Sequence, residues 1–377
     1  MRDERLGGLA MAKSRNSNIE LLRILSILII MWTHLSLLPQ LKETNYPFLS
    51  GLIANLGGVG DNLFFGITAW FMCNESPNFR KSCRRVWKLE QQLLFYALGL
   101  FAICTVLFFS GYPLFHSTGS WLHLGVVSVM PVLAGLWWYP TAYVVFVLIC
   151  PWLNIGLKAI GRAGHGFIAV LGVVMWGVLP YVAKGMDLSA FMFIYLYIPM
   201  AYLRWYRSDL ERSRLMAWAL TLGGLFVSSA SYAVRKILIG SFTYGVDPWY
   251  LPSMCAALGI ILLTTQARPR HSRVINAIAK STLAVYLVHL NWGIFPLWQN
   301  ILSCILIGSG LSNQPWILFV AHFTCVVLLY LFIVVIDMIR RKLFNLTINR
   351  LGHENRWFNR VWMFLIRFSP KLAQNNL

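Results

Sequence analysis

Arg23 and His34 are the residues of the first apolar segment whose types could do chemistry. They lie eleven positions apart in the stretch 18–38. At about 100° per residue, that spacing is three helical turns plus about 20°, so both side chains project from one face, roughly 16 Å apart along the axis. Histidine can take a proton from a hydroxyl group near neutral pH, and arginine can hold a phosphate. The alternative is that each side chain only reaches one membrane interface.

The element that carries these residues is predicted to be a transmembrane helix, since about 20 apolar residues cross the hydrocarbon layer. Ionisable groups at that depth are costly and usually face a bundle interior or a wet cavity. His34 is therefore a candidate catalytic base, beside the alternative that it only reaches the membrane interface. Arg23, nearer the other end, is expected to act with it, either paired with Glu20 or holding a charged group of a substrate.

Composition identifies a membrane protein. The 377 residues are 58% hydrophobic and 12% charged, whereas soluble domains carry about 25% charged residues. The net charge of +19 lies in short loops, and nothing resembles a nucleic-acid-binding module, so no nucleic-acid partner is expected. The seven cysteines show neither metal-binding spacing nor a disulfide framework, and no metal site is predicted.

The apolar segments predict an all-α, polytopic bundle of about ten transmembrane helices. Of the 32 Lys and Arg residues, 27 fall in one set of alternating segments and four in the other set, and Arg23 lies inside a span. Basic segments stay cytoplasmic, so both termini are predicted to be inside and the number of spans to be even. The predicted spans are 19–38, 52–73, 89–110, 136–156, 166–183, 189–204, 214–234, 249–266, 281–307 and 315–339.

Three further groups are candidate binding residues. Asp61 and Asn62 follow a glycine-rich stretch of the second span; Asp61 could bind substrate, or could cap a helix that starts there. Arg84 and Arg85 belong to a basic loop, 74–88, that could hold donor phosphates or only fix the topology. Tyr286 and His289 are three residues apart on one helical face, where the histidine could serve a site or be a hydrogen-bonded structural group.

Several motifs resemble one family. Arg-x10-His in the first span follows Asn18-x-Glu20-Leu-Leu, and Asn62-Leu-Phe, Tyr202-x-Arg204 and Tyr286-Leu-Val-His289 follow in order. Together they are similar to the acyltransferase-3 family of bacterial integral-membrane sugar O-acyltransferases, over about residues 16–345. Thr68-Ala69 stands where that family usually has Ser-Gly, and Leu290 where it often has Asp.

The resemblance implies an O-acyltransferase of the bacterial inner membrane. It implies acetyl-coenzyme A, arriving from the cytoplasm, as the usual co-substrate, and a cell-surface polysaccharide or its lipid-linked precursor as acceptor. The alternative is a transporter or flippase of a lipid-linked sugar, in which buried Arg and His would gate a path. Transporters commonly show internal repeats, and the chain has no convincing one.

The two ends are expected to lie outside this membrane domain. Residues 1–15 are polar and predicted to be a disordered cytoplasmic segment. Residues 346–377 are predicted to be a cytoplasmic tail containing a basic amphipathic helix that lies on the lipid bilayer. In this helix Trp357, Val361, Phe364, Leu365 and Phe368 share one face, and Arg356, Arg360, Arg367 and Lys371 share another.

Overall fold

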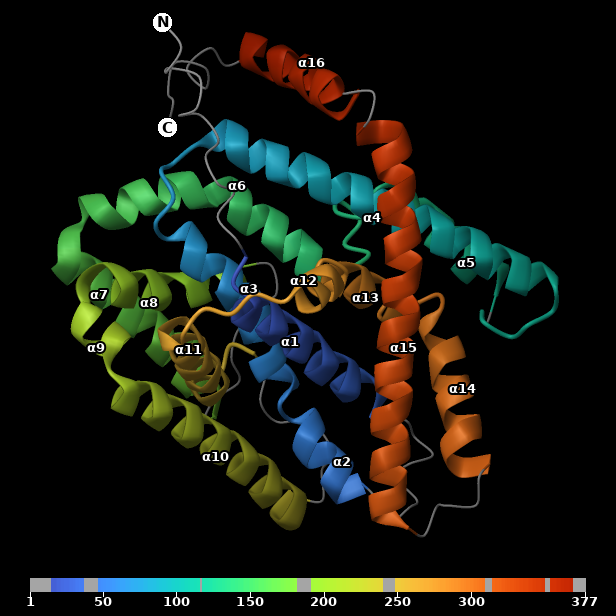
Figure 1. Ribbon diagram of the computed structural model, residues 1–377, viewed down its shortest axis with the longest axis horizontal. Coiled ribbons are helices and arrows are strands. Elements are labelled where there is room, and N and C mark those ends of the chain that lie inside the picture. Colours follow the sequence, from blue (N-terminus) through green and yellow to red (C-terminus); the bar gives the residue numbers. More distant parts are fainter. Residues whose placement is uncertain are drawn as a thin grey trace, which may run out of the picture.

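The structure, a computed structural model, describes residues 15–36, 47–115, 117–181, 191–239, 248–308, 314–349 and 353–368. Helices run through these residues, which contain no strand (Figure 1). The prediction of an all-α chain is confirmed. Most of the predicted disordered segment 1–15 lies outside the described residues, as does Lys371 of the predicted tail helix.

Six helices of the described part are long and apolar enough to cross a membrane: Ser17–Leu35, Phe79–Phe109, Trp138–Ala159, Gly161–Val178, Arg214–Leu238 and Pro315–Ile348. They correspond to six of the predicted spans. The other four predicted spans fall on shorter helices, so the count of ten stays a prediction.

Helix α1 (Ser17–Leu35) lies at the centre of the bundle. Its N-terminus is capped by Asn16, whose side chain accepts a hydrogen bond from the backbone of Asn18. It packs against α2 (Pro47–Ala54), α3 (Gly57–Met72), α11 (Leu251–Gln266), α12 (Arg273–Ala279), α13 (Thr282–His289) and α15 (Pro315–Phe344). Ile27, Ile30 and Met31 are almost fully buried there, so α1 contributes apolar packing to most of the fold.

The glycines of α3 let it approach α1 closely. A Cβ atom on Gly57 would lie 2.5 Å from Oγ1 of Thr33, and one on Gly60 would lie 3.0 Å from the backbone oxygen of Ser26. Helix α3 starts at Gly57, so Asp61 lies inside the helix and not at its start. The interpretation of Asp61 as a helix cap is wrong, because these glycines are helical packing positions.

Two predicted spans are broken. The segment 52–73 divides into α2 and α3 at Asn55–Leu56, and the segment 281–307 divides into α13 and α14 (Phe295–Gly308). At the second break the side chain of Asn291 accepts a hydrogen bond from the backbone of Gly293. Helix α13 ends at His289, just before that turn.

The basic segment 74–88 was expected to be a loop, but most of it is helical. Helix α4 (Phe79–Phe109) starts at Phe79 after an Asn78 cap that accepts from the backbone of Lys81. Arg84 and Arg85 therefore have fixed helical positions, and their side chains point in directions about 100° apart.

The remaining helices complete the bundle. The long loop 111–135 contains α5 (Thr118–Val129), which packs on α4. Helix α7 continues through π-helical and 3-10 turns at Val173–Val178 and Leu179–Tyr181, and a π-helical turn at Asn345–Asn349 follows α15. The other helices are α6 (Trp138–Ala159), α7 (Gly161–Gly172), α8 (Met192–Tyr206), α9 (Ser208–Arg212), α10 (Arg214–Ile239) and α16 (His353–Phe368).

Candidate active site

The structure brings His34 and His289 together although they are 255 residues apart. Nδ1 of His34 lies 3.3 Å from Nε2 of His289, and the ring centroids are 5.4 Å apart. His34 is partly accessible near the end of α1, whereas His289 is fully buried at the end of α13. Nδ1 of His289 lies 2.8 Å from the carbonyl oxygen of Val285. The two predicted histidines thus form one pair.

A row of rings extends from this pair. Tyr286 lies one helical turn before His289, with ring centroids 5.9 Å apart in an edge-on arrangement. Its ring is in turn 5.5 Å from that of Tyr139 on α6. The ring of Tyr286 thus contacts that of His289 on one side and that of Tyr139 on the other.

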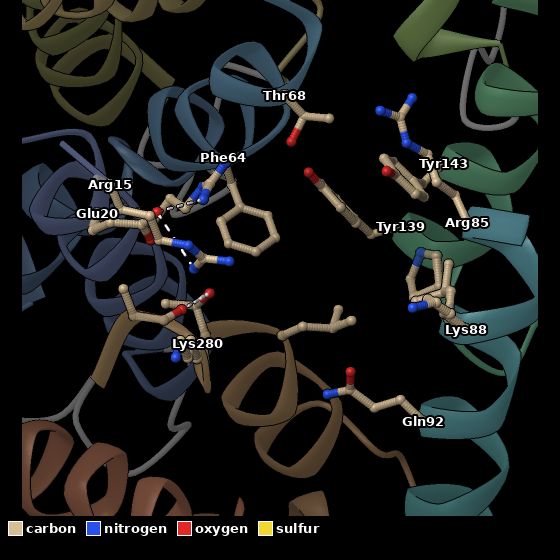
Figure 2. Close-up of a pocket in the computed structure, with 16 residues that line it drawn as sticks. Arg15, Glu20, Phe64, Thr68, Arg85, Lys88, Gln92, Tyr139, Tyr143 and Lys280 are labelled. Atoms are coloured by element: carbon tan, nitrogen blue, oxygen red, sulfur yellow. Dashed lines mark hydrogen bonds and ion pairs between the residues drawn. The ribbon is translucent and has the colours of Figure 1, made fainter. Parts of the chain in front are cut away.

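Tyr139 forms part of the wall of a cavity of about 450 Å³. Figure 2 shows Arg85, Lys88 and Gln92 on one side of this cavity and Arg15 and Glu20 on the opposite side. We call it the cationic cavity, because among the described residues one carboxylate, that of Glu20, lines it beside five cationic side chains: Arg15, Arg23, Arg85, Lys88 and Lys280.

Helix α1 supplies both Glu20 and Arg23 to the cavity. Oε1 of Glu20 accepts a hydrogen bond of 3.1 Å from Nη1 of Arg23, and Arg15 lies 3.7 Å from the same oxygen. Only 5% of Glu20 is exposed, so two cations compensate a buried carboxylate. The expected Arg23–Glu20 pair is present, and the guanidinium still borders the cavity.

Helix α4 turns a single face toward the cavity. Arg85, Lys88, Leu89 and Gln92 line it, a spacing that places side chains above one another on a helix. Arg84 is exposed and does not line the cavity. The two arginines that the sequence treats as a pair are therefore separated by the structure.

Glu75, in the turn before α4, holds Arg85. Nη2 of Arg85 lies 2.6 Å and 2.8 Å from the two carboxylate oxygens, and Nζ of Lys81 lies 2.7 Å from one of them. Partial burial raises the pKa of Glu75, but the hydrogen bonds from Arg85 and Lys81 outweigh it, so the pKa lies below its ordinary value. The ionised carboxylate fixes the direction of Arg85.

Asp61 and Asn62 lie outside the cationic cavity. Asn62 donates a 2.6 Å hydrogen bond to the carbonyl oxygen of Pro248 and so ties α3 to the segment before α11. Asp61 is near enough to Tyr139 and Tyr286 for an electrostatic interaction. Asp61 therefore interacts electrostatically with both tyrosines, whereas the contact of Asn62 is a structural one.

The sequence did not identify several residues of the cavity. Tyr139 and Tyr143 of α6 and Lys280 before α13 line it, together with Thr68. Lys280 lies six residues before the Tyr286-Leu-Val-His289 motif, and Thr68 stands where the family usually has Ser, but neither position indicates on which side of its helix the cavity lies.

The comparisons with known proteins agree with this arrangement of motifs. The model of the acyltransferase-3 family, described as an acyltransferase domain, matches residues 16–336. No curated protein and no solved structure matches the chain. The matched region contains both histidines and every residue that lines the cationic cavity except Arg15. The chain belongs to the acyltransferase-3 family, and it is a membrane acyltransferase.

Proposed function

We propose that this protein transfers an acetyl group from acetyl-coenzyme A to a hydroxyl of a cell-surface or lipid-linked polysaccharide in the bacterial inner membrane. The observation that carries the proposal is the connection of the cationic cavity to the histidine pair through Tyr139 and Tyr286. One end offers charges for phosphates, and the other offers a base.

The cationic cavity suits the phosphates of an acyl carrier. Guanidinium and ammonium groups donate charge-assisted hydrogen bonds to phosphate oxygens. Arg15, Arg85 and Lys280 come from three segments that the charge distribution assigns to the cytoplasm, the compartment that contains acetyl-coenzyme A. Arg23 and His34 are eleven residues apart on α1, a separation that suits a long, thin carrier with its thioester near His34.

The proposed reaction balances with His34 as the base. Nε2 of His34 takes the proton of the acceptor hydroxyl as its oxygen attacks the thioester carbon. The new C–O bond forms, the C–S bond breaks, and the proton passes to the departing thiolate. His34 is regenerated, and no further reactant is needed.

The test uses radiolabelled acetyl-coenzyme A and inverted membrane vesicles. Wild-type vesicles are expected to incorporate label into glycan, and His34→Gln to lose about 10²- to 10⁴-fold in turnover per folded molecule, since its amide cannot take the proton. Thermal melting of the purified variant supplies the folded fraction. Near-normal turnover by His34→Gln would refute the assignment, and glycan movement without label would identify a transporter.

Arg23 provides an independent test of the donor end. Arg23→Lys keeps the charge but loses the planar fork, so we expect an intermediate rise in the apparent KM for donor. Arg23→Ala should raise it further, because it also leaves the buried Glu20 with less compensation. Unchanged donor KM in both variants would remove Arg23 from the binding site.

A further inference from the structure

The hydrogen bonds of the histidine pair determine which nitrogen atoms carry protons. A backbone carbonyl only accepts, so Nδ1 of His289, 2.8 Å from the Val285 oxygen, must be the protonated nitrogen. Nε2 of a neutral His289 then carries a lone pair. Its 3.3 Å contact with Nδ1 of His34 requires the proton to be on His34. The ring of His34 also hydrogen-bonds to the backbone carbonyl of Ile30, one turn earlier on α1, which likewise can only accept. Nε2 of His34 is left as the free base.

We propose that His289 is a positioning residue that holds His34 in the Nδ1–H tautomer, with Nε2 available to the acceptor hydroxyl. This inference rests on the proposed function of His34. It replaces the expectation that His289 binds substrate or donor directly. His289 is fully buried, and both of its ring nitrogens already have partners within the protein.

The same contact stabilises the charged form of His34. When Nε2 takes a proton, the ring becomes an imidazolium, and its Nδ1–H bond to His289 becomes charge-assisted. The proton cannot travel on through His289, because the carbonyl of Val285 already accepts the Nδ1 proton of that ring. It stays on His34 until the thiolate takes it. A neutral acceptor performs this role without bringing another net charge into the apolar interior.

The break after α13 makes the contact possible. The helix ends at His289, and the Asn291–Gly293 turn follows. Trp137 and Trp298 donate indole hydrogen bonds to the carbonyl oxygens of Leu287 and Val288, at 3.1 Å and 3.3 Å. These bonds hold the last turn of α13 in place. The position of the His289 backbone and the hydrogen bond to the Val285 carbonyl together fix the orientation of the His289 ring.

The experiment compares His289→Leu with His289→Gln in the full-length protein. Leucine removes the acceptor, so kcat should fall by about 100-fold or more, since loss of the group that fixes a histidine tautomer can cost about 10⁴-fold. Glutamine offers an amide oxygen to Nδ1–H of His34 and should restore much of kcat. Donor KM should change little in either variant, because His289 does not line the cationic cavity.

A second readout does not depend on activity. In the protein labelled with ¹⁵N-histidine, NMR should show protonated Nδ1 and unprotonated Nε2 for His34 in the wild type. In His289→Leu the Nε2–H tautomer should appear. Assignment comes from the signals lost in His34→Gln.

His165 provides the matched control for burying a histidine. It is fully buried on α7, and its Nε2 lies 2.9 Å from the carbonyl oxygen of Ile198. His165→Leu should lower stability and leave kcat per folded molecule and the His34 signals unchanged.

The outcomes separate the two proposals. If His34→Gln is inactive and His289→Leu has normal kcat, the positioning role is refuted and the base survives. If wild-type His34 is the Nε2–H tautomer, the positioning role is refuted, and Nε2 of His34 is refuted as the basic atom. If His34→Gln is active, the proposed base is refuted and the positioning role falls with it.

Discussion

Arg84 and Arg85 are adjacent in the sequence but have different surroundings. Arg85 is ion-paired with Glu75 and borders the cationic cavity, whereas Arg84 is exposed on another side of α4. The difference follows from helix geometry, since adjacent residues point about 100° apart. Arg84 is thus a natural control for Arg85, with the same charge and the same helix.

We predict that Arg85→Gln raises the apparent KM for the acyl donor and that Arg84→Gln does not. A hydrogen bond to a charged group contributes about 1.5–3 kcal/mol, so an increase of about 10- to 100-fold is expected. The increase in the Arg85 variant should persist in purified protein, and the wild-type affinity should weaken as salt is added. If the donor KM of both variants equals the wild-type value, these arginines have a topological role alone.

The packing of helices depends on where glycine permits close approach. On α10, a Cβ on Gly224 would lie 2.5 Å from the backbone nitrogen of Ala256 and 2.6 Å from the backbone oxygen of Pro252, both on α11. The adjacent Gly223 has nothing within 4 Å of such an atom. Alanine substitutions at these two positions therefore distinguish the cost of overpacking between helices from the gain in helix propensity.

Gly224→Ala is expected to destabilise the protein by about 1–3 kcal/mol, the usual cost of overpacking, since the clash is with backbone. Gly223→Ala should be neutral or slightly stabilising because alanine favours the helix. Melting temperatures of both variants in detergent provide the comparison. A Gly224→Ala protein as stable as wild type would show that α10 and α11 can separate without cost.

The tail helix α16 has three different sides. Phe358 and Trp362 are buried, with rings against Trp87 and Phe79 of α4. Further round the helix, Trp357, Phe364 and Phe368 are 55–76% exposed, and the basic residues Arg356, Arg360 and Arg367 come next. The side that packs on α4 was not expected; the exposed apolar side next to a basic one is typical of membrane-surface helices.

We predict that the exposed apolar side of α16 enters the lipid surface. A fluorophore on Phe364→Cys, in a background without other reactive cysteines, should be quenched by labelled lipid chains in nanodiscs, more strongly with anionic lipid. Met363→Cys, turned by about 100° from Phe364, should be quenched less. Equal quenching at both positions would contradict this orientation.

At the scale of the whole molecule, three predicted cytoplasmic segments meet. Arg15, Arg85 and Lys280 line one cavity, and the backbone nitrogen of Ser17 donates a 2.8 Å hydrogen bond to the carbonyl oxygen of Arg270. Segments that share a cavity belong on one side of the membrane, which agrees with the charge distribution. The absolute orientation of the bundle remains a prediction.

Reporter fusions test that orientation. Fusions after Lys42, after Ser117 and near Asn313 should report an extracytoplasmic position, and a fusion near Arg162 should report the cytoplasm. The fusion after Ser117, at the start of α5, is the most informative. A cytoplasmic signal there would reverse the assignment of the segment between α4 and α6.

The sequence by itself determined the membrane class, the family and the first helix of the site. Apolar length and loop charge are properties of local segments, and the placing of Arg23 and His34 on one side of α1 depends only on helical periodicity. For the same reason the amphipathic tail could be recognised before its packing was known.

Only the tertiary structure decided how separate helices meet. No local pattern indicates that His289 lies against His34, that Arg85 and Lys280 share a cavity while Arg84 does not, or that helices break at Asn55–Leu56 and after His289. These features depend on close approach between helices and on hydrogen bonds across the bundle. In an apolar interior, partners distant in sequence determine where each polar group can lie.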